Sequence, residues 1–309
     1  MNRTLIIGSR GSKLALFQAE QAKALLLEAN PTLEVRIEII KTTGDVKSDP
    51  LTAIGGKGVF TKELEDALMD RRIDIAVHSL KDLPTIVPPE LTIGAVCERE
   101  DPRDALVLRP DLVTSSGTLD GLPQEAIVGT SSQRRFTQLR ALRADVVIKD
   151  LRGNVDTRLR KLDEGQYEAL ILAAAGLRRL GLSDRITTAI SPEHMLPAVG
   201  QGAVGIEVRR DDDAALEAVT PLDHESTRIA CLAERSFLRA LGGGCQLPIA
   251  AHAVLDQREL KVDGLVASAD GTQIVRDKIS GNSTDAELLG NKLAEHLISM
   301  GADSLLDNA

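Results

Sequence analysis

The chain of 309 residues is poor in aromatic side chains and in cysteine. Phe, Tyr and Trp make up 2% of the residues, and Trp is absent. A binding site made of stacked rings is therefore not expected, and neither is nucleic-acid binding by base stacking. The three cysteines, Cys97, Cys231 and Cys245, are too widely spaced for a disulfide framework or a zinc site. We expect no metal site.

The sequence also lacks segments that would send the protein to a membrane or out of the cell. No run of about 18 apolar residues that could span a bilayer is present. The N-terminus leads straight into a predicted strand, without the hydrophobic region of a signal peptide. We predict a cytoplasmic protein without membrane contact, and a monomer, because no amphipathic face is left over.

Charge is unevenly distributed along the chain. The net charge is -9, yet residues 129–181 contain eleven Lys and Arg against six Asp and Glu. A basic segment in an acidic protein indicates an anionic ligand. Solvated helix faces would explain part of the same excess.

The order of predicted elements favours an α/β fold with two doubly wound domains. Strands and helices alternate within residues 4–80, and the pattern restarts within residues 127–173. A βαβαβ order implies a parallel sheet. Each half opens with a strand and a polar loop, at 8–12 and at 129–132. Ligands of such folds bind at the carboxyl ends of the strands, so we expect both loops to face one cleft.

The pattern changes after residue 220. A long amphipathic helix is predicted at 226–241, followed by three strands between 249 and 280 and a final helix. This order is typical of a small α+β domain. We predict three domains, which comprise residues 1–98 with 201–220, residues 102–197, and residues 224–309.

Cys245 lies in a glycine-rich loop, Leu241-Gly-Gly-Gly-Cys-Gln-Leu-Pro248, after that helix. Three glycines leave space and allow backbone angles that are closed to other residues. No histidine is near in sequence to act as a base, and a helix C-terminus disfavours a thiolate. The loop indicates an attachment point for a bulky group. A buried cysteine in a Gly-rich helix cap is the alternative.

Two arginine-rich stretches are typical of anion binding at helix starts. In Gly129-Thr-Ser-Ser-Gln-Arg-Arg135 a serine would cap a helix whose first turn carries two arginines, and Leu151-Arg-Gly-Asn-Val-Asp-Thr-Arg158 is similar. The helix dipole disfavours each such cation by about 0.3–1 kcal/mol, so we expect an anion to bind there. Arginine forks suit carboxylate or phosphate. Salt bridges to Asp150 and Asp156 are the alternative.

Three further segments are candidates for chemistry. His78-Ser-Leu-Lys-Asp-Leu-Pro84 ends a predicted buried strand, and Asp82 there could protonate a leaving group or stabilise a cation. Asp as a turn former is the alternative. Gly55-Gly-Lys-Gly58 lacks Walker A spacing, and we interpret it as a mobile lid with Lys57. Gly200-Gln-Gly-Ala-Val-Gly205 matches G-x-G-x-x-G but leads into a strand, so we interpret it as a hinge between domains.

Six stretches together resemble the porphobilinogen deaminase (hydroxymethylbilane synthase) family. They follow the family's order over nearly the whole chain: His78-Ser-Leu-Lys-Asp82, Cys97-Glu-Arg-Glu-Asp-Pro-Arg-Asp104, Gly129-Thr-Ser-Ser-Gln-Arg-Arg135, Leu151-Arg-Gly-Asn-Val155, Leu196-Pro-Ala-Val-Gly-Gln-Gly-Ala-Val-Gly-Ile-Glu207 and Gly243-Gly-Cys-Gln246. The resemblance implies that the first two domains are built like type II periplasmic binding proteins. It also implies an enzyme that joins four porphobilinogen molecules head to tail with loss of ammonia, and then releases hydroxymethylbilane with water.

The resemblance further implies a set of site residues. Cys245 would hold a dipyrromethane cofactor through a thioether, and Asp82 would be the catalytic aspartate. Further contacts to the cofactor would come from Lys81, Thr130, Ser132, Arg134, Arg135 and Arg152. Contacts to the substrate, porphobilinogen, would come from Arg10, Ser12, Arg158, Arg179 and Gln201. Lys57 and Phe60 would belong to the lid.

Two other classes of function stay open on the residues alone. A non-catalytic solute receptor would also close two α/β lobes on an anion, but the predicted lack of a signal peptide argues against it. A cysteine-dependent acyl transferase could use His252, seven residues after Cys245. That histidine falls in a predicted strand, and no partner for it is apparent.

Overall fold

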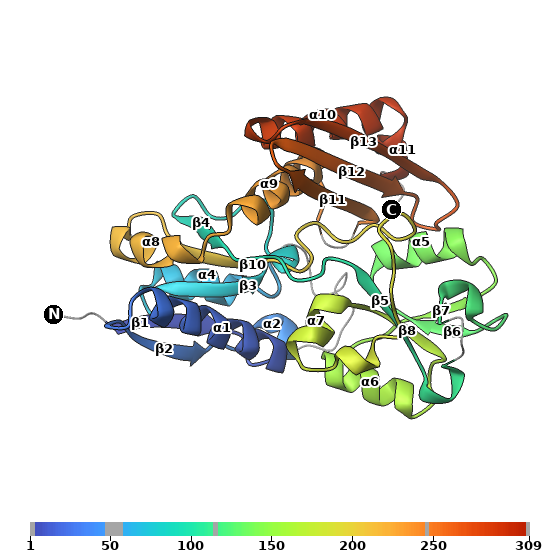
Figure 1. Ribbon diagram of the computed structural model, residues 1–309, viewed down its shortest axis with the longest axis horizontal. Coiled ribbons are helices and arrows are strands. Elements are labelled where there is room, and N and C mark those ends of the chain that lie inside the picture. The colour runs from blue at the N-terminus through green and yellow to red at the C-terminus, as the bar shows by residue number, and fades with distance from the viewer. Residues whose placement is uncertain (1–3, 47–57, 114–116, 245–246, 307–309) are drawn as a thin grey trace. The chain divides into compact units, whose positions relative to one another are not determined.

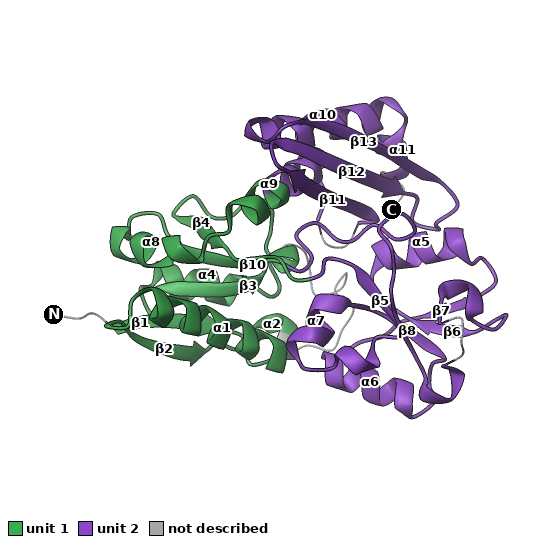
Figure 2. Cartoon of the chain, in the orientation of Figure 1, with its two compact units in different colours: residues 1–100, 203–231 green, residues 101–202, 232–309 purple. Residues whose placement is uncertain are grey.

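The computed structural model describes residues 4–46, 58–113, 117–244 and 247–306, and the chain divides into two compact units (Figure 2). Unit 1 comprises residues 1–100 and 203–231, and unit 2 comprises residues 101–202 and 232–309. Each unit is therefore made of two separate segments of the chain. The helix α9 (Glu225–Ala240) carries residues of both units.

Unit 1 is built on a five-stranded sheet of order β2-β1-β3-β10-β4 (Figure 1). The strands β1, β2 and β3 are parallel, whereas β10 is antiparallel to β3 and to β4. The sheet was expected to be parallel but is mixed. The strand β10, which follows the second α/β segment in the chain, lies between β3 and β4 of the first segment and runs antiparallel to both. The strands are β1 (Thr4–Ser9), β2 (Glu34–Ile39), β3 (Ile75–Ser79), β4 (Leu91–Val96) and β10 (Val204–Arg209).

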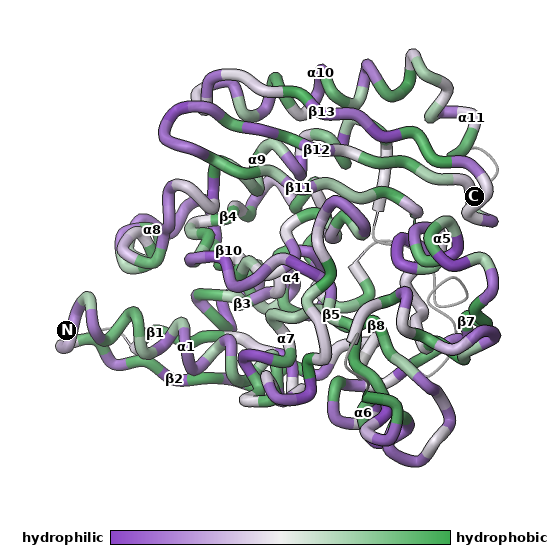
Figure 3. The backbone as a smooth tube through the Cα atoms, turned by 45° about the vertical axis from the view of Figure 1, so that its right-hand side comes forward, coloured by the Kyte–Doolittle hydropathy of each residue, from purple (hydrophilic) through white to green (hydrophobic). Residues whose placement is uncertain are grey.

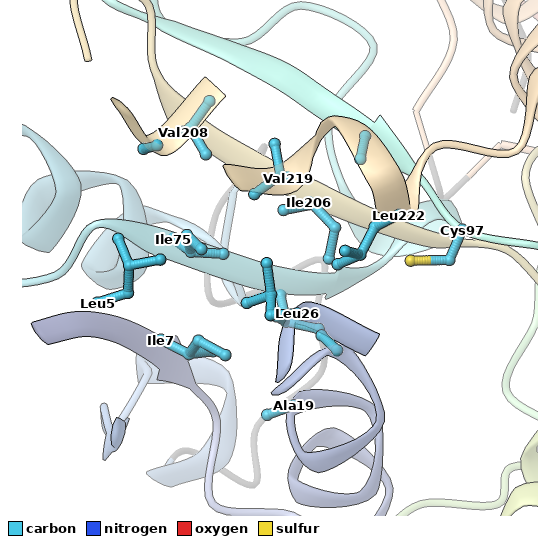
Figure 4. Packing of buried hydrophobic residues seen from close by; sticks show 14 of the residues in the cluster. Leu5, Ile7, Ala19, Leu26, Ile75, Cys97, Ile206, Val208, Val219 and Leu222 are labelled. Atoms are coloured by element: carbon cyan, nitrogen blue, oxygen red, sulfur yellow. The ribbon is translucent and has the colours of Figure 1, made fainter. Parts of the chain in front are cut away.

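Helices cover both faces of this sheet, as a doubly wound fold requires. On one face α1 buries Ala19, Ala22 and Leu26, which are spaced for a single helix face, against β1, β3 and β10 (Figure 4). The other face packs Leu64 and Leu68 of α4. The helices of unit 1 are α1 (Lys13–Ala29), α2 (Thr43–Val46), α4 (Lys62–Met69) and α8 (Asp213–Val219), with 3-10 turns η1 (Leu80–Asp82) and η5 (Thr220–Leu222).

Unit 2 contains a second five-stranded sheet, of order β7-β6-β8-β5-β9. Again three strands are parallel and the fourth, β5, is antiparallel to its neighbours. The residues of β5 alternate between two core clusters, one on each face, so this strand is buried on both sides. The elements are β5 (Asp104–Leu108), β6 (Ile127–Gly129), α5 (Gln133–Leu142), β7 (Val147–Lys149), α6 (Val155–Asp163), β8 (Ala169–Ala173), α7 (Ala174–Arg179) and β9 (Thr188–Ala189), with 3-10 turns η2 (Pro110–Leu112), η3 (Leu119–Gly121) and η4 (Ser183–Arg185).

The C-terminal part of unit 2 is an antiparallel meander of three strands with helices packed on it, and its strands fall where the sequence predicts them. Figure 3 shows hydrophobic and hydrophilic stretches in turn along α10, the pattern of a helix with one face buried. Gly264 lies under Phe237 and Leu293, where a Cβ would be 2.7 Å from the Phe237 ring. The elements are β11 (Ile249–Asp256), β12 (Glu259–Ala267), β13 (Ile274–Asn282), η6 (Ser283–Asp285), α10 (Ala286–Ser299) and α11 (Ala302–Leu306).

This meander and the second five-stranded sheet share one compact unit. Leu196, whose carbonyl oxygen accepts from Arg134 of α5, packs with Ala250 and Leu265 of the meander. The predicted boundaries of three domains stay a prediction. Within the described ranges, no helix has the length and hydrophobicity needed to cross a membrane.

Candidate active site

The segment with the predicted catalytic aspartate forms one 3-10 turn, η1, directly after β3. Leu80 and Leu83 are buried at the two ends of the turn, and the Leu83 amide donates to the Leu80 carbonyl oxygen at 3.2 Å. Lys81 and Asp82 lie between them and are partly exposed. The turn therefore presents these two side chains while its own apolar residues hold it to the core.

A buried polar pair lies just before this turn and was not predicted from the sequence. Nε2 of His78 on β3 is 3.0 Å from Oε2 of Glu207 on β10, and both side chains are at most 3% exposed. Glu65 on α4 lies near the pair: burial raises the pKa of Glu65 above its usual value, and the charge of Glu207 acts in the same direction. The buried His78 and Glu207 and the half-buried Glu65 thus form a group of three ionisable side chains close to the end of β3.

Two predicted site residues of unit 1 lie against each other, although 50 positions separate them in the chain. The guanidinium carbon of Arg10, in the loop after β1, lies 4.2 Å from the centre of the Phe60 ring. Phe60 in turn packs on Gly44, where a Cβ would be 2.1 Å from the ring. Ser12 caps α1 by accepting a hydrogen bond from the Ala15 amide at 3.2 Å. Lys57 lies outside the described residues.

In unit 2 the polar loop between β6 and α5 forms the predicted helix cap. Ser132 Oγ accepts from the Arg135 amide at 3.4 Å, and Thr130 Oγ1 accepts from the Ser132 amide at 3.2 Å. Ser131 Oγ donates to the Leu151 carbonyl oxygen at 2.7 Å, which ties this loop to the segment after β7. A pocket opens here, lined by Thr130, Ser131, Ser132, Gln133, Phe136, Ile148, Lys149 and Asp150.

Arg134 and Arg135 do not line that pocket, because both are buried and bound to Asp104 on β5. Arg134 Nη1 donates to Asp104 Oδ2 at 2.6 Å, and Arg135 Nη2 donates to Asp104 Oδ1 at 2.7 Å. The fully buried Asp104 also accepts from Gln201 Nε2 at 3.0 Å. Burial alone would raise the pKa of Asp104, but the charges of the two guanidinium groups outweigh it and hold that pKa far below its usual range.

An anion does therefore accompany the two arginines, and within the described residues it is the chain's own carboxylate. The alternative of structural salt bridges named Asp150 and Asp156, whereas the structure pairs these arginines with Asp104, 30 positions upstream of Arg134. For Arg152 the alternative is confirmed, because its Nε pairs with Asp150 at 3.2 Å in a partly exposed salt bridge.

The remaining arginines of the predicted site bind main-chain oxygens. Arg158 Nε donates to the Gly153 carbonyl oxygen at 2.7 Å, and Arg179 Nη2 donates to that of Gly202 at 2.8 Å. Asn154 stands at the N-cap of α6, but its side chain makes no capping hydrogen bond. Arg158 lies in α6 and Arg179 ends α7, so these contacts attach the two helices to the loop residues Gly153 and Gly202.

The attachment point predicted at Cys245 lies outside the described residues, as does Gln246. The three glycines before it are described and differ from one another. Gly242, after α9, has a φ of +66°, a left-handed angle that favours glycine. A Cβ at Gly243 would lie 2.6 Å from Leu238, whereas no described atom lies within 4 Å of a Cβ at Gly244. The backbone is thus tightly packed at Gly243, whereas a side chain would have space at Gly244, directly before Cys245.

Comparisons with known proteins point to one family. The model of the "Porphobilinogen deaminase, dipyromethane cofactor binding domain" matches residues 5–217, and that of the "Porphobilinogen deaminase, C-terminal domain" matches residues 228–299. Porphobilinogen deaminase of Roseiflexus sp. (strain RS-1) is 52% identical over 307 residues, which cover 99% of each chain. Porphobilinogen deaminase of Synechococcus sp. (strain RCC307) is 52% identical over 304 residues, 98% of this chain and 95% of that protein.

Among solved structures, the chain is similar to the second substrate binding domain of a putative amino acid ABC transporter from Streptococcus pneumoniae, with 12% identity and a TM-score of 0.46 over 78% of this chain and 95% of that one. The sequence relatives carry the assignment, since two family models and relatives about half identical over nearly their whole length agree. The chain belongs to the porphobilinogen deaminase family.

Proposed function

We propose that the chain is a porphobilinogen deaminase. It joins four porphobilinogen molecules head to tail, with loss of one ammonia for each, on a dipyrromethane primer bound to Cys245, and releases hydroxymethylbilane by hydrolysis. The observation that carries the proposal is the match to relatives of that name over 99% of the chain at about half identity. A solute receptor or an acyl transferase would leave this match unexplained.

The pocket at the start of α5 suits a ligand that carries carboxylate arms. Its lining includes Thr130, Ser132 and Lys149, whose side chains can donate hydrogen bonds, and also Asp150, which pairs with Arg152. The N-terminus of the ten-residue helix α5 adds partial positive charge at the same place. Each pyrrole of a dipyrromethane carries two carboxylates, so this donor set fits the cofactor.

We assign Thr130, Ser132, Lys81 and Arg152 to contacts with the cofactor, which, when bound, supplies the end to which each new pyrrole is joined. Arg134 and Arg135 were predicted in the same role. Their contacts favour a supporting one, since a cofactor carboxylate would have to compete with Asp104 for both guanidinium groups. Arg10, Ser12, Arg158, Arg179 and Gln201 are assigned to the substrate, and Lys57 with Phe60 to a lid over it.

Asp82 is assigned as the catalytic residue. Asp82 stands on a short turn that is anchored by buried leucines, so the backbone that carries its carboxylate is held in place. A fixed carboxylate stabilises the positive charge that develops as ammonia leaves the substrate. Three domains, a monomeric state and a cytoplasmic location complete the proposal.

The test is the stoichiometry of the reaction. The purified protein with porphobilinogen should release four ammonia molecules for each hydroxymethylbilane formed. The variant Asp82→Asn should still carry the covalent cofactor, seen by intact mass, while turnover stops. Binding of porphobilinogen without release of ammonia by the wild-type protein would refute the proposal, and a fully active Asp82→Asn would refute the role of Asp82.

A further inference from the structure

The Gly200-Gln-Gly-Ala-Val-Gly205 segment has the spacing of a dinucleotide-binding loop but another geometry, since β10 and not a helix follows it. Gly200 and Gly202 have φ angles of +69° and +90°, which other residues disfavour, so the turn needs glycine at both positions. The Gly200 amide donates to Oε2 of the buried Glu234 at 2.7 Å. Gly205 lies within β10, where glycine weakens a strand, and needs a different explanation.

Gly205 leaves the space that Leu80 fills. A Cβ at position 205 would lie 2.8 Å from Leu80 Cδ1, closer than non-bonded carbon atoms are found, so a side chain there would force Leu80 or the strand to shift. Leu80 cannot simply turn away, because it is 1% exposed and packs in a buried cluster with Leu83, Val96, Ala203 and Cys231. The Leu80 amide also donates to the Ala203 carbonyl oxygen at 3.0 Å, so its backbone is attached to the same segment.

Leu80 is the first residue of the turn that carries Lys81 and Asp82. Two positions earlier, His78 pairs in register with Gly205 and binds Glu207 at 3.0 Å, which fixes β3 against β10 just before the turn. The turn is therefore held by a backbone hydrogen bond to Ala203, directly before β10, and by two contacts with β10 itself: the buried polar pair and the packing of Leu80 on Gly205.

We propose that Gly205 is a positioning residue for Asp82. Because glycine has no side chain, Leu80 can pack directly on β10 at this position, and this contact sets where the turn places the Asp82 carboxylate. The proposal rests on the proposed function, because it takes Asp82 to act on porphobilinogen. The third glycine of this segment thus serves the catalytic turn and not a phosphate group.

The test is Gly205→Ala, compared with Gly94→Ala in the neighbouring strand of the same sheet. A Cβ at position 94 would lie 2.8 Å from Val219 and 3.0 Å from Val208, so the crowding is similar but acts on other core residues. Gly205→Ala should lower kcat by about 10- to 100-fold, the effect of a small misplacement of a reacting group, while KM changes less. Gly94→Ala should show a similar fall in melting temperature and keep most of its kcat.

The rescue variant separates positioning from general damage. Leu80→Val removes the Cδ1 atom that meets the new methyl group, so Gly205→Ala/Leu80→Val should regain much of the kcat that Gly205→Ala loses. Leu80→Val alone completes the double-mutant cycle. Intact mass should show that every variant carries the cofactor. If Gly205→Ala does not fold, Leu80→Ala removes the same packing contact by shortening the Leu80 side chain, and it should lower kcat.

Equal kcat for Gly205→Ala and Gly94→Ala would overturn the proposal, and so would a double variant no more active than Gly205→Ala, or a Leu80→Ala variant with wild-type kcat. These outcomes differ from failure of the proposed function, in which the wild-type protein itself would not consume porphobilinogen.

Discussion

The salt bridge of Asp104 with Arg134 and Arg135 makes the strongest prediction for stability. Asp104→Asn keeps the shape of the side chain but removes the negative charge between two guanidinium groups that are 4% and 6% exposed. Breaking a buried ion pair from one side costs about 3–5 kcal/mol, because the remaining charge stays buried without compensation. We expect a loss of this size in the free energy of unfolding of unit 2.

Thermal and urea unfolding of the holoprotein measure this loss, and Asp150→Asn is the matched control. Asp150 also pairs with an arginine of unit 2, but the two side chains are 67% and 36% exposed. The control should cost at most about 1 kcal/mol, the range for exposed pairs. Equal stability of Asp104→Asn and Asp150→Asn would refute the reasoning.

The pH dependence gives a second check on the same group. The folded pKa of Asp104 lies below its unfolded value of about 3.9, so the stability that it contributes is fully present above that value. It is lost only as the pH falls through the folded pKa. The difference between wild type and Asp104→Asn should therefore stay constant from neutral pH down to about pH 5 and shrink only in stronger acid. A difference that shrinks near neutral pH would contradict the assignment.

Two further predictions concern unit 1. The pKa of Glu65 is raised in the folded protein, so the stability linked to this group is present below its unfolded pKa and is lost as the pH rises through the folded pKa. Glu65→Gln should therefore gain melting temperature relative to wild type as the pH rises, and parallel curves would rule this out. Phe60→Leu removes the ring under Arg10 and should raise KM for porphobilinogen by about two- to fivefold, the equivalent of 0.5–1 kcal/mol, whereas Phe60→Tyr should keep it. An unchanged KM in the leucine variant would exclude this contact from substrate binding.

Local sequence patterns predicted correctly those features that depend on a single helix or strand, such as its cap and its ends. Ser132 caps α5, as predicted for a serine of that loop, and the three C-terminal strands follow their alternating pattern. The polar loop after β6 and the turn after β3 lie at strand ends for the same reason. Such patterns describe the faces and ends of an element without reference to the rest of the chain.

Pairings between distant segments were not predictable from the same patterns. His78 and Glu207 are 129 positions apart, and neither residue type nor spacing indicates that they meet. The antiparallel insertion of β10 brings them together, and a strand's own alternation does not specify its neighbour or its direction. Asp104 was missed as the partner of the arginines for the same reason, since nearer aspartates were available in the sequence.

The measurement that tests the account most directly is the intact mass of the purified protein, with peptide mapping of the segment around Cys245. The account predicts a covalent excess equal to two porphobilinogen molecules less two ammonia molecules, located on Cys245 and absent from Cys245→Ala. A protein that stays unmodified at Cys245 even after incubation with porphobilinogen would contradict it.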